Sequence, residues 1–306
     1  MNDGGRSTEE TRTAGHSHAR LGCRSILFVP GYRPDRFGKA LAAGADAVCI
    51  DLEDAVPPQR KVVAREATVR FLAERPAEGP RNETDPPHLI IRINDPETDL
   101  GRADAEALRD IRQPDAFMIP KVRTAAGLRR AVGLLRDGAP LFALIETALG
   151  LENAADIGQA SPAVAGLVFG GFDLALELRA DPSWEPLLYA RSRVVHAAAL
   201  SGLDAIDMPS VDFGEMRRLR EEAGRVRLLG FAGKMAIHPA QLPVIHEVFT
   251  PSELEVERAL RILDADREAG GGAVALEGRM VDRPVAEVAR RVLARARAAA
   301  DREASK

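Results

Sequence analysis

Eight short apolar runs, each followed by a stretch with helical spacing, constrain the fold of this chain more than any other feature. The runs are rich in Val, Ile, Leu and Phe. Apolar runs that alternate with amphipathic helices are typical of a parallel α/β fold. Eight such units match a (β/α)8 TIM barrel in number and size. We expect the strands at residues 25–30, 47–52, 89–94, 116–122, 141–147, 165–170, 204–208 and 228–232.

An open, doubly wound sheet is the alternative architecture. Many such sheets bind dinucleotides through a Gly-x-Gly-x-x-Gly turn after the first strand. The first run instead ends at Pro30 and is followed by Gly31, Tyr32, Arg33 and Pro34. The sequence therefore favours the barrel and disfavours NAD binding.

Composition divides the 306 residues into three parts and limits the classes of partner. Residues 1–22 are polar, contain His16 and His18, and are expected to be a disordered tail without an apolar stretch for secretion or membrane insertion. Residues 23–250 would form the barrel, and residues 251–306 would form C-terminal helices and a lid.

A net charge of −4 argues against nucleic acid as a partner. The only cysteines are Cys23 and Cys49, so we do not expect a disulfide framework. This low cysteine content predicts a cytoplasmic location.

Glu146 and Asp173 each follow an apolar run and lie one strand-helix-strand step apart. In a parallel sheet the two acids would meet at the carboxyl ends of neighbouring strands. Mg²⁺ is typically held by one or two carboxylates together with water and substrate oxygens. The pair therefore indicates a Mg²⁺ site, although acids after strands also serve as helix caps or are simply solvated.

Other charged residues end the second, third and fourth runs. Asp51, Glu53 and Asp54 follow the second run and Arg92 ends the third. An arginine at this rim can stabilise an oxyanion, or it can pair with the acids as a structural ion pair. Lys121 follows the fourth run; a Schiff-base role is conceivable, but a rim ion pair is the commoner case.

Further candidates lie in the first turn, after the eighth run and in the tail. Arg33 and Lys39 near the first helix are suited to phosphates, although basic residues there are often merely exposed. His238, before a proline, is interpreted as a loop anchor or a base, and Asp282 as a helix cap. Three glycines at 270–272 precede Asp282, so the tail is either a lid or arm that reaches a neighbouring subunit, or a layer packed on the barrel.

Seven segments in register resemble the HpcH/HpaI aldolase/citrate lyase family, in particular its citrate lyase β-subunit-like proteins and malyl-CoA or citramalyl-CoA lyases. The resemblance implies a (β/α)8 barrel, usually a homotrimer (or hexamer), that binds Mg²⁺ at the carboxyl-end rim. The segments are residues 24–31, 51–56, 91–94, 119–121, 145–148, 169–173 and 233–239.

By this resemblance, Glu146 and Asp173 match the family's Mg²⁺ ligands, and Arg92 matches its substrate-binding, enolate-stabilising arginine. Asp282 looks like the acid/base that a neighbouring subunit contributes. The positions that contact coenzyme A in the malyl-CoA lyases match Phe28, Arg33, Lys39, Ile237 and His238.

The implied reaction is reversible Claisen cleavage of a 3-hydroxyacyl-CoA to an acyl-CoA and a 2-oxo acid, with Glu53 and Asp54 supporting catalysis together with Asp51. Three alternatives stay open. They are a thioesterase on the same substrate, a citrate lyase subunit acting on a citryl acyl-carrier protein, and a scaffold without turnover. The sequence does not select the oxo acid or the direction of the reaction.

Overall fold

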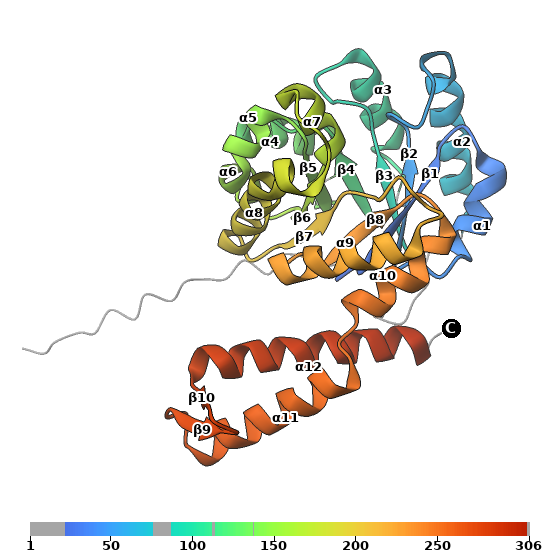
Figure 1. The fold of residues 1–306 in the computed structure, drawn as a ribbon. Helices are drawn as coiled ribbons and strands as arrows, with labels where there is room; N and C mark the ends of the chain where they lie inside the picture. The colour runs from blue at the N-terminus through green and yellow to red at the C-terminus, as the bar shows by residue number, and fades with distance from the viewer. Residues whose placement is uncertain (1–21, 76–86, 112–113, 137, 305–306) are drawn as a thin grey trace, which may run out of the picture.

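The barrel is closed and parallel. The computed structural model describes residues 22–75, 87–111, 114–136 and 138–304, and within them eight strands follow one another in sequence order around the barrel. β1 pairs with β2 on one side and with β8 on the other (Figure 1). The predicted (β/α)8 barrel is therefore confirmed. The strands are β1 (Ser25–Pro30), β2 (Ala47–Asp51), β3 (His88–Arg92), β4 (Ala116–Ile119), β5 (Leu141–Ile145), β6 (Val164–Phe169), β7 (Asp204–Asp207) and β8 (Gly233–Ala236).

Helices surround the strands, with short 3₁₀ turns in three of the connections (Figure 1). The α-helices are α1 (Phe37–Leu41), α2 (Lys61–Glu74), α3 (Asp99–Leu108), α4 (Ala125–Leu134), α5 (Ala148–Glu152), α6 (Ala154–Gly158), α7 (Gly171–Leu178), α8 (Trp184–Leu200), α9 (Met216–Leu229) and α10 (Leu242–Phe249). The 3₁₀ turns are η1 (Pro34–Arg36), η2 (Pro58–Arg60) and η3 (Pro239–Gln241).

Three consecutive helices start in the same way at the carboxyl ends of β3, β4 and β5. The hydroxyls of Thr98, Thr124 and Thr147 each accept a hydrogen bond from the N–H three residues later. Such caps satisfy an otherwise unpaired donor of the first turn. At Gly150 a Cβ would lie 2.3 Å from the carbonyl oxygen of Val122, so glycine lets this helix start approach the loop after β4. These local contacts set the shape of the rim.

The eighth strand does not lie where the sequence predicted it. Residues 228–232 contain the end of α9, which stops at Gly230 in a left-handed conformation with φ 109°, and the strand itself is Gly233–Ala236. The prediction was wrong because Lys234 interrupts the apolar pattern. Its ammonium is fully buried but donates to Asp207 and Glu222 at 2.7 and 2.8 Å, and these carboxylates make its burial tolerable.

The C-terminal part forms an arm that projects from the barrel, with a small hairpin at its far end (Figure 1). It consists of α11 (Glu253–Glu268), β9 (Val274–Leu276), β10 (Arg279–Val281) and α12 (Arg283–Ala304). The last turn of α12 returns to the barrel, where Arg302 lies 3.7 Å from Asp46, just before β2. The arm is therefore attached at the amino end of the barrel, and it is no lid over the carboxyl rim of its own chain.

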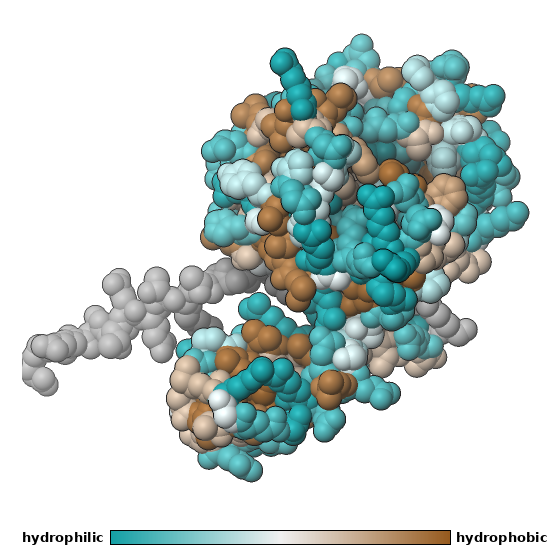
Figure 2. Space-filling model, in the orientation of Figure 1, coloured by the Kyte–Doolittle hydropathy of each residue, from teal (hydrophilic) through white to brown (hydrophobic). Residues whose placement is uncertain are grey.

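Apolar side chains remain at the surface of the arm, seen as brown patches among teal in Figure 2. Leu254, Leu260, Met280 and Val288 are at least 50% exposed. Contact of the arm with a neighbouring subunit stays a prediction.

The remaining expectations concern the termini, the cysteines and the membrane. Residues 1–21, including His16 and His18, lie outside the described residues. Cys23 and Cys49 are both buried and are not joined in a disulfide. Of the helices that the structure describes, none is both long and apolar enough to span a bilayer.

Candidate functional site

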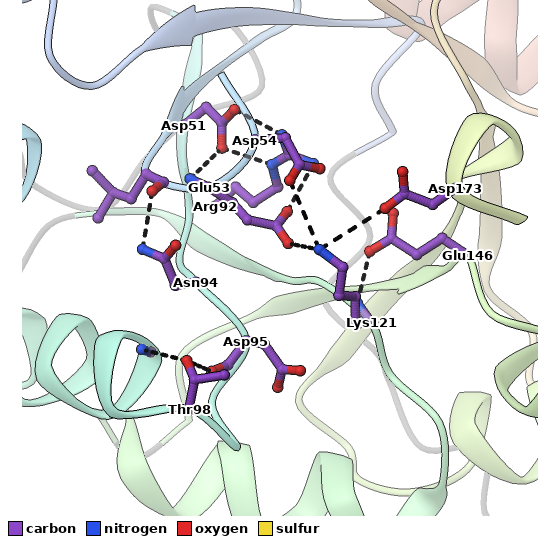
Figure 3. Close-up of polar contacts among 12 residues, drawn as sticks. Asp51, Glu53, Asp54, Arg92, Asn94, Asp95, Thr98, Lys121, Glu146 and Asp173 are labelled. Atoms are coloured by element: carbon purple, nitrogen blue, oxygen red, sulfur yellow. Dashed lines mark hydrogen bonds and ion pairs between the residues drawn. The ribbon is translucent and has the colours of Figure 1, made fainter. Parts of the chain in front are cut away.

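Charged side chains from the carboxyl ends of β2 to β6 meet at one rim of the barrel (Figure 3). Glu146 directly follows β5, and Asp173 lies in the first turn of α7, after β6. β5 and β6 are hydrogen-bonded neighbours. The two acids therefore share one rim, and their carboxylates face the same space in Figure 3.

Arg92 is held in a fixed orientation by a buried carboxylate. Its Nε and NH2 atoms each donate to Asp51 at 2.7 Å, and the backbone N–H groups of Glu53 and Ala55 donate to the same carboxylate. Burial opposes the charge of Asp51, but the guanidinium outweighs it and holds the pKa of Asp51 below its ordinary value. The guanidinium carbon also lies 5.2 Å from the centroid of the Phe28 ring. The remaining nitrogen, NH1, lies 3.1 Å from Glu53 and 3.8 Å from Asp54.

Lys121 connects the acids that follow β2 with those that follow β5 and β6. Its Nζ donates to Glu53 at 2.5 Å and lies 3.8 Å from Asp54 and 3.9 Å from Asp173. Its backbone N–H donates to Glu146 Oε1 at 2.8 Å. The rim lysine is thus in an ion pair, the commoner of its two predicted roles.

The pKa values of Glu53 and Lys121 follow from burial and from the neighbouring charges. Burial raises the pKa of Glu53 to about 7, with help from the negative charge of Asp54 and against Arg92 and Lys121. Burial also opposes the charge of Lys121, but its hydrogen bond with Glu53 outweighs this and raises the lysine pKa above its ordinary value. Lys121 therefore carries a proton at neutral pH, which does not suit a Schiff-base nucleophile.

Glu146 and Asp173 are poorly compensated by protein cations. Burial raises the pKa of Glu146 well above its ordinary value, and the nearby charges of Glu53 and Asp173 raise it further. Burial and the charge of Asp54 likewise raise the pKa of Asp173. The Lys121 ammonium, 3.9 Å from Asp173, does not offset these effects, and a bound divalent cation would supply the further positive charge.

The space beside Glu146 is also kept open. A Cβ at Gly170 would lie 2.4 Å from the Cβ of Glu146 and 2.6 Å from its Oε2, so any larger residue would displace this carboxylate. In the described part of the chain, no group of three or more His, Cys, Asp or Glu side chains is arranged to hold a metal ion. Two carboxylate ligands nevertheless fit Mg²⁺, which keeps several waters and takes further oxygens from its substrate.

The residues expected to contact coenzyme A come from the first and last units of the barrel. Phe28 is on β1 beneath Arg92, Arg33 is paired at the surface with Asp35 at 2.7 Å, and Lys39 is exposed on α1. β1 and β8 are neighbours, so these residues and the loop after β8 lie on one side of the barrel.

Ile237 and His238 follow β8 directly. Ile237 is exposed, whereas the His238 ring stacks on Phe213 with a centroid distance of 5.1 Å. Its Nδ1 accepts a hydrogen bond from the backbone N–H of Ala240 at 3.2 Å and caps η3. This geometry agrees with the loop-anchor interpretation of His238.

Asp282 is separated from the other candidates within one chain. It directly follows β10 at the far end of the arm, where its carboxylate accepts from the N–H of Val285 at 3.2 Å. The predicted helix cap is therefore present. Any part that Asp282 takes at the rim requires a second subunit.

Two residues without a predicted role, Lys61 and Asn94, also support the rim. The Nζ of Lys61 donates to the carbonyl oxygens of Leu52 and Glu53 and to the side chain of Asn94, at 2.7 to 3.0 Å. Asn94 in turn donates to the carbonyl oxygen of Leu52 at 2.9 Å. Asn94 belongs to the segment 91–94, but that segment does not reveal these contacts, because Lys61 and Asn94 meet only after the second and third units have folded together.

Comparison with protein families gives two matches. Residues 24–239 match the model of the HpcH/HpaI aldolase/citrate lyase family. Residues 181–300 match a model described as C–C bond lyase of the TIM-barrel fold, and this match includes most of the arm.

Curated relatives and solved structures agree with these matches. The chain is 39% identical to (3S)-malyl-CoA thioesterase of Cereibacter sphaeroides, over 92% of this chain and 97% of the relative. It is 35% identical to a citrate lyase subunit beta-like protein of Deinococcus radiodurans, over 88% and 96%. The structure of CitE from Mycobacterium tuberculosis in complex with magnesium, acetoacetate and coenzyme A superimposes with a TM-score of 0.75 at 33% identity, covering 90% of this chain and 98% of that one.

Proposed function

Because this chain belongs to the HpcH/HpaI aldolase/citrate lyase family, we propose that it is a Mg²⁺-dependent carbon–carbon lyase. Its substrate would be a 3-hydroxyacyl-CoA of the malyl-CoA or citramalyl-CoA type, cleaved reversibly to an acyl-CoA and a 2-oxo acid. The observation that carries the proposal is the juxtaposition of the undercompensated pair Glu146 and Asp173 with an anchored arginine, Arg92.

Glu146 and Asp173 are the residues that would hold Mg²⁺. The ion would supply Lewis-acid stabilisation of charge on the hydroxyl and carboxylate oxygens of the substrate. Gly170 keeps the Glu146 carboxylate free to take part.

Arg92 would stabilise the enolate oxygen that develops on the thioester as the carbon–carbon bond breaks. Asp51 occupies Nε and NH2, so NH1, which lies 3.1 Å from Glu53, is the nitrogen that would donate to the substrate. A donor fixed before the reaction needs no reorganisation during it, which makes its stabilisation of the transition state larger. Glu53 and Asp54 would orient NH1 and Lys121 from the same side.

Asp282 of a neighbouring subunit would protonate the enolate carbon, and in the synthetic direction it would remove the α-proton. Two features support this. Asp282 lies at the end of an arm attached at the opposite end of its own barrel, and the arm exposes apolar side chains suited to contact with another copy. A homotrimer, or a hexamer built from it, would bring the arm to the next rim.

Coenzyme A would lie across the β1 and β8 side of the rim. Phe28 and Ile237 offer apolar contact, and Arg33 and Lys39 offer positive charge for phosphates. His238 would act indirectly, because it anchors the loop that carries Ile237.

A product assay tests the proposal. Purified protein with Mg²⁺ is offered malyl-CoA and (S)-citramalyl-CoA, and 2-oxo acid and free thiol are followed separately. We expect glyoxylate or pyruvate without thiol, abolished by Glu146→Ala or EDTA and retained in Glu152→Ala, an exposed acid nearby on α5. If neither substrate yields a 2-oxo acid, lyase activity on these free CoA esters is contradicted.

Hydrolysis of the same thioester is the second candidate, favoured by the 39% identical relative named a (3S)-malyl-CoA thioesterase. Release of free thiol together with intact hydroxy acid would identify it. A citrate lyase β-subunit role, suggested by the Deinococcus relative, would appear as activity with a citryl acyl-carrier protein and none with CoA esters.

A further inference from the structure

Lys121 follows β4 and places its ammonium beside the proposed metal ligand Asp173. Its ammonium lies within 4 Å of Glu53, Asp54 and Asp173, and its side chain is 31% exposed. Figure 3 shows it between the carboxylates that follow β2 and the Glu146–Asp173 pair. The ammonium therefore partly neutralises the charge that a divalent cation would otherwise meet.

The backbone of Lys121 is held in an unfavourable conformation to achieve this. Its φ is +52°, in the left-handed region that residues other than glycine rarely adopt. In this conformation the backbone N–H reaches Glu146 while the side chain crosses to Glu53. Strained residues persist where surrounding contacts hold them, and they are concentrated at functional sites.

We propose that Lys121 is an internal counter-ion that weakens Mg²⁺ binding at Glu146 and Asp173 until a 2-oxo acid is present. The inference rests on the proposed metal site. The ammonium attracts the Asp173 carboxylate, 3.9 Å away, and its positive charge would repel the metal ion. A 2-oxo acid brings further oxygen ligands and a negative charge, which offsets the lysine charge. Metal and oxo acid then increase each other's affinity, because such coupling is reciprocal.

The test is a calorimetric titration of Mg²⁺ into the metal-free protein, with and without pyruvate or glyoxylate. A unit charge at about 4 Å in water interacts by about 1 kcal/mol, which corresponds to about a fivefold change in a binding constant. We expect Lys121→Met to bind Mg²⁺ at least about fivefold more tightly without oxo acid. The gain in affinity caused by the oxo acid should shrink by a similar factor.

Two controls isolate the charge. Lys121→Arg keeps the charge and should bind Mg²⁺ like the wild type. Arg123→Met removes a cation two residues away that pairs with Asp95 and Glu97 instead of the site acids, and it should also be unchanged. If Lys121→Met fails to fold, Lys121→Met with Glu53→Gln removes both partners and is compared with Glu53→Gln alone.

The outcomes separate this inference from the proposed function. Unchanged or weaker Mg²⁺ binding by Lys121→Met, with normal binding by the wild type, would overturn the counter-ion role and leave the metal site in place. Absence of Mg²⁺ binding by the wild type, even with saturating oxo acid, would overturn the metal site itself, and the inference with it.

Discussion

Asp51→Asn tests whether the buried carboxylate that holds Arg92 is needed for catalysis. Each oxygen of Asp51 accepts one hydrogen bond from a backbone N–H, of Glu53 or Ala55, and one from the guanidinium. An asparagine in either orientation therefore places its NH2 group against two donors. Breaking a buried ion pair while leaving one charge in place costs about 3–5 kcal/mol. We expect a loss of this size in the free energy of unfolding, measured by urea denaturation.

Activity should fall as well, because Arg92 loses its fixed orientation. A misplacement of about 1 Å can lower the rate about 100-fold. We expect kcat to fall by about this factor while Mg²⁺ affinity changes much less, since Glu146 and Asp173 are retained. Initial rates with the preferred CoA ester and a calorimetric titration of Mg²⁺ would measure the two effects.

Asp46→Asn is the matched control at the opposite end of the barrel. Asp46 is buried and accepts two hydrogen bonds from the guanidinium of Arg24, each at 2.9 Å. Asp46→Asn should lower the free energy of unfolding to a similar extent. Its kcat should equal that of the wild type under conditions in which the variant is folded. A destabilised but fully active Asp51→Asn variant, or an equal loss of activity in Asp46→Asn, would show that the Asp51–Arg92 pair is not needed for catalysis.

Three further predictions follow from the same contacts. Gly170→Ala should displace the Glu146 carboxylate, weaken Mg²⁺ binding in calorimetry and lower the free energy of unfolding by about 1–3 kcal/mol. Gly133→Ala is the control, because no atom lies within 4 Å of the added Cβ, and it should leave Mg²⁺ binding intact. Normal Mg²⁺ binding by Gly170→Ala would contradict this geometry. Glu146→Ala and Asp282→Ala should each be inactive, yet subunits mixed by refolding should regain up to about a quarter of wild-type activity if each site uses two chains; no recovery in mixed oligomers would argue against the shared site. Arg24 holds the pKa of Asp46 below its ordinary value despite burial, so this contribution to stability is complete above about pH 4 and is lost as the pH falls through the lowered pKa. The difference in urea midpoint between wild type and Asp46→Asn should therefore narrow at acid pH, and a constant difference from pH 7 to pH 3 would refute the assignment.

Much of the barrel was predictable because each strand and the helix after it can be identified from the pattern of apolar and polar residues within a short segment of the chain. The first seven strands lie at or within a few residues of the predicted runs. The eighth was placed too early, because periodicity counts Lys234 as polar and cannot detect that Asp207 and Glu222 neutralise it across the fold. Hydropathy describes single residues, whereas the free energy of burial depends on partners.

The alternation of strands and helices that closes the parallel barrel can be inferred from local sequence patterns. The rim to which Glu146, Asp173 and Arg92 belong follows from it, because the strands share one direction and each of these residues lies at or shortly after the end of its own strand. The contacts of these groups depend on the folded arrangement. It paired Arg92 with Asp51, forced Lys121 into a strained conformation between opposing acids, and carried Asp282 away from the rim of its own chain. These outcomes depend on distances and burial between segments far apart along the chain, and no local pattern records them.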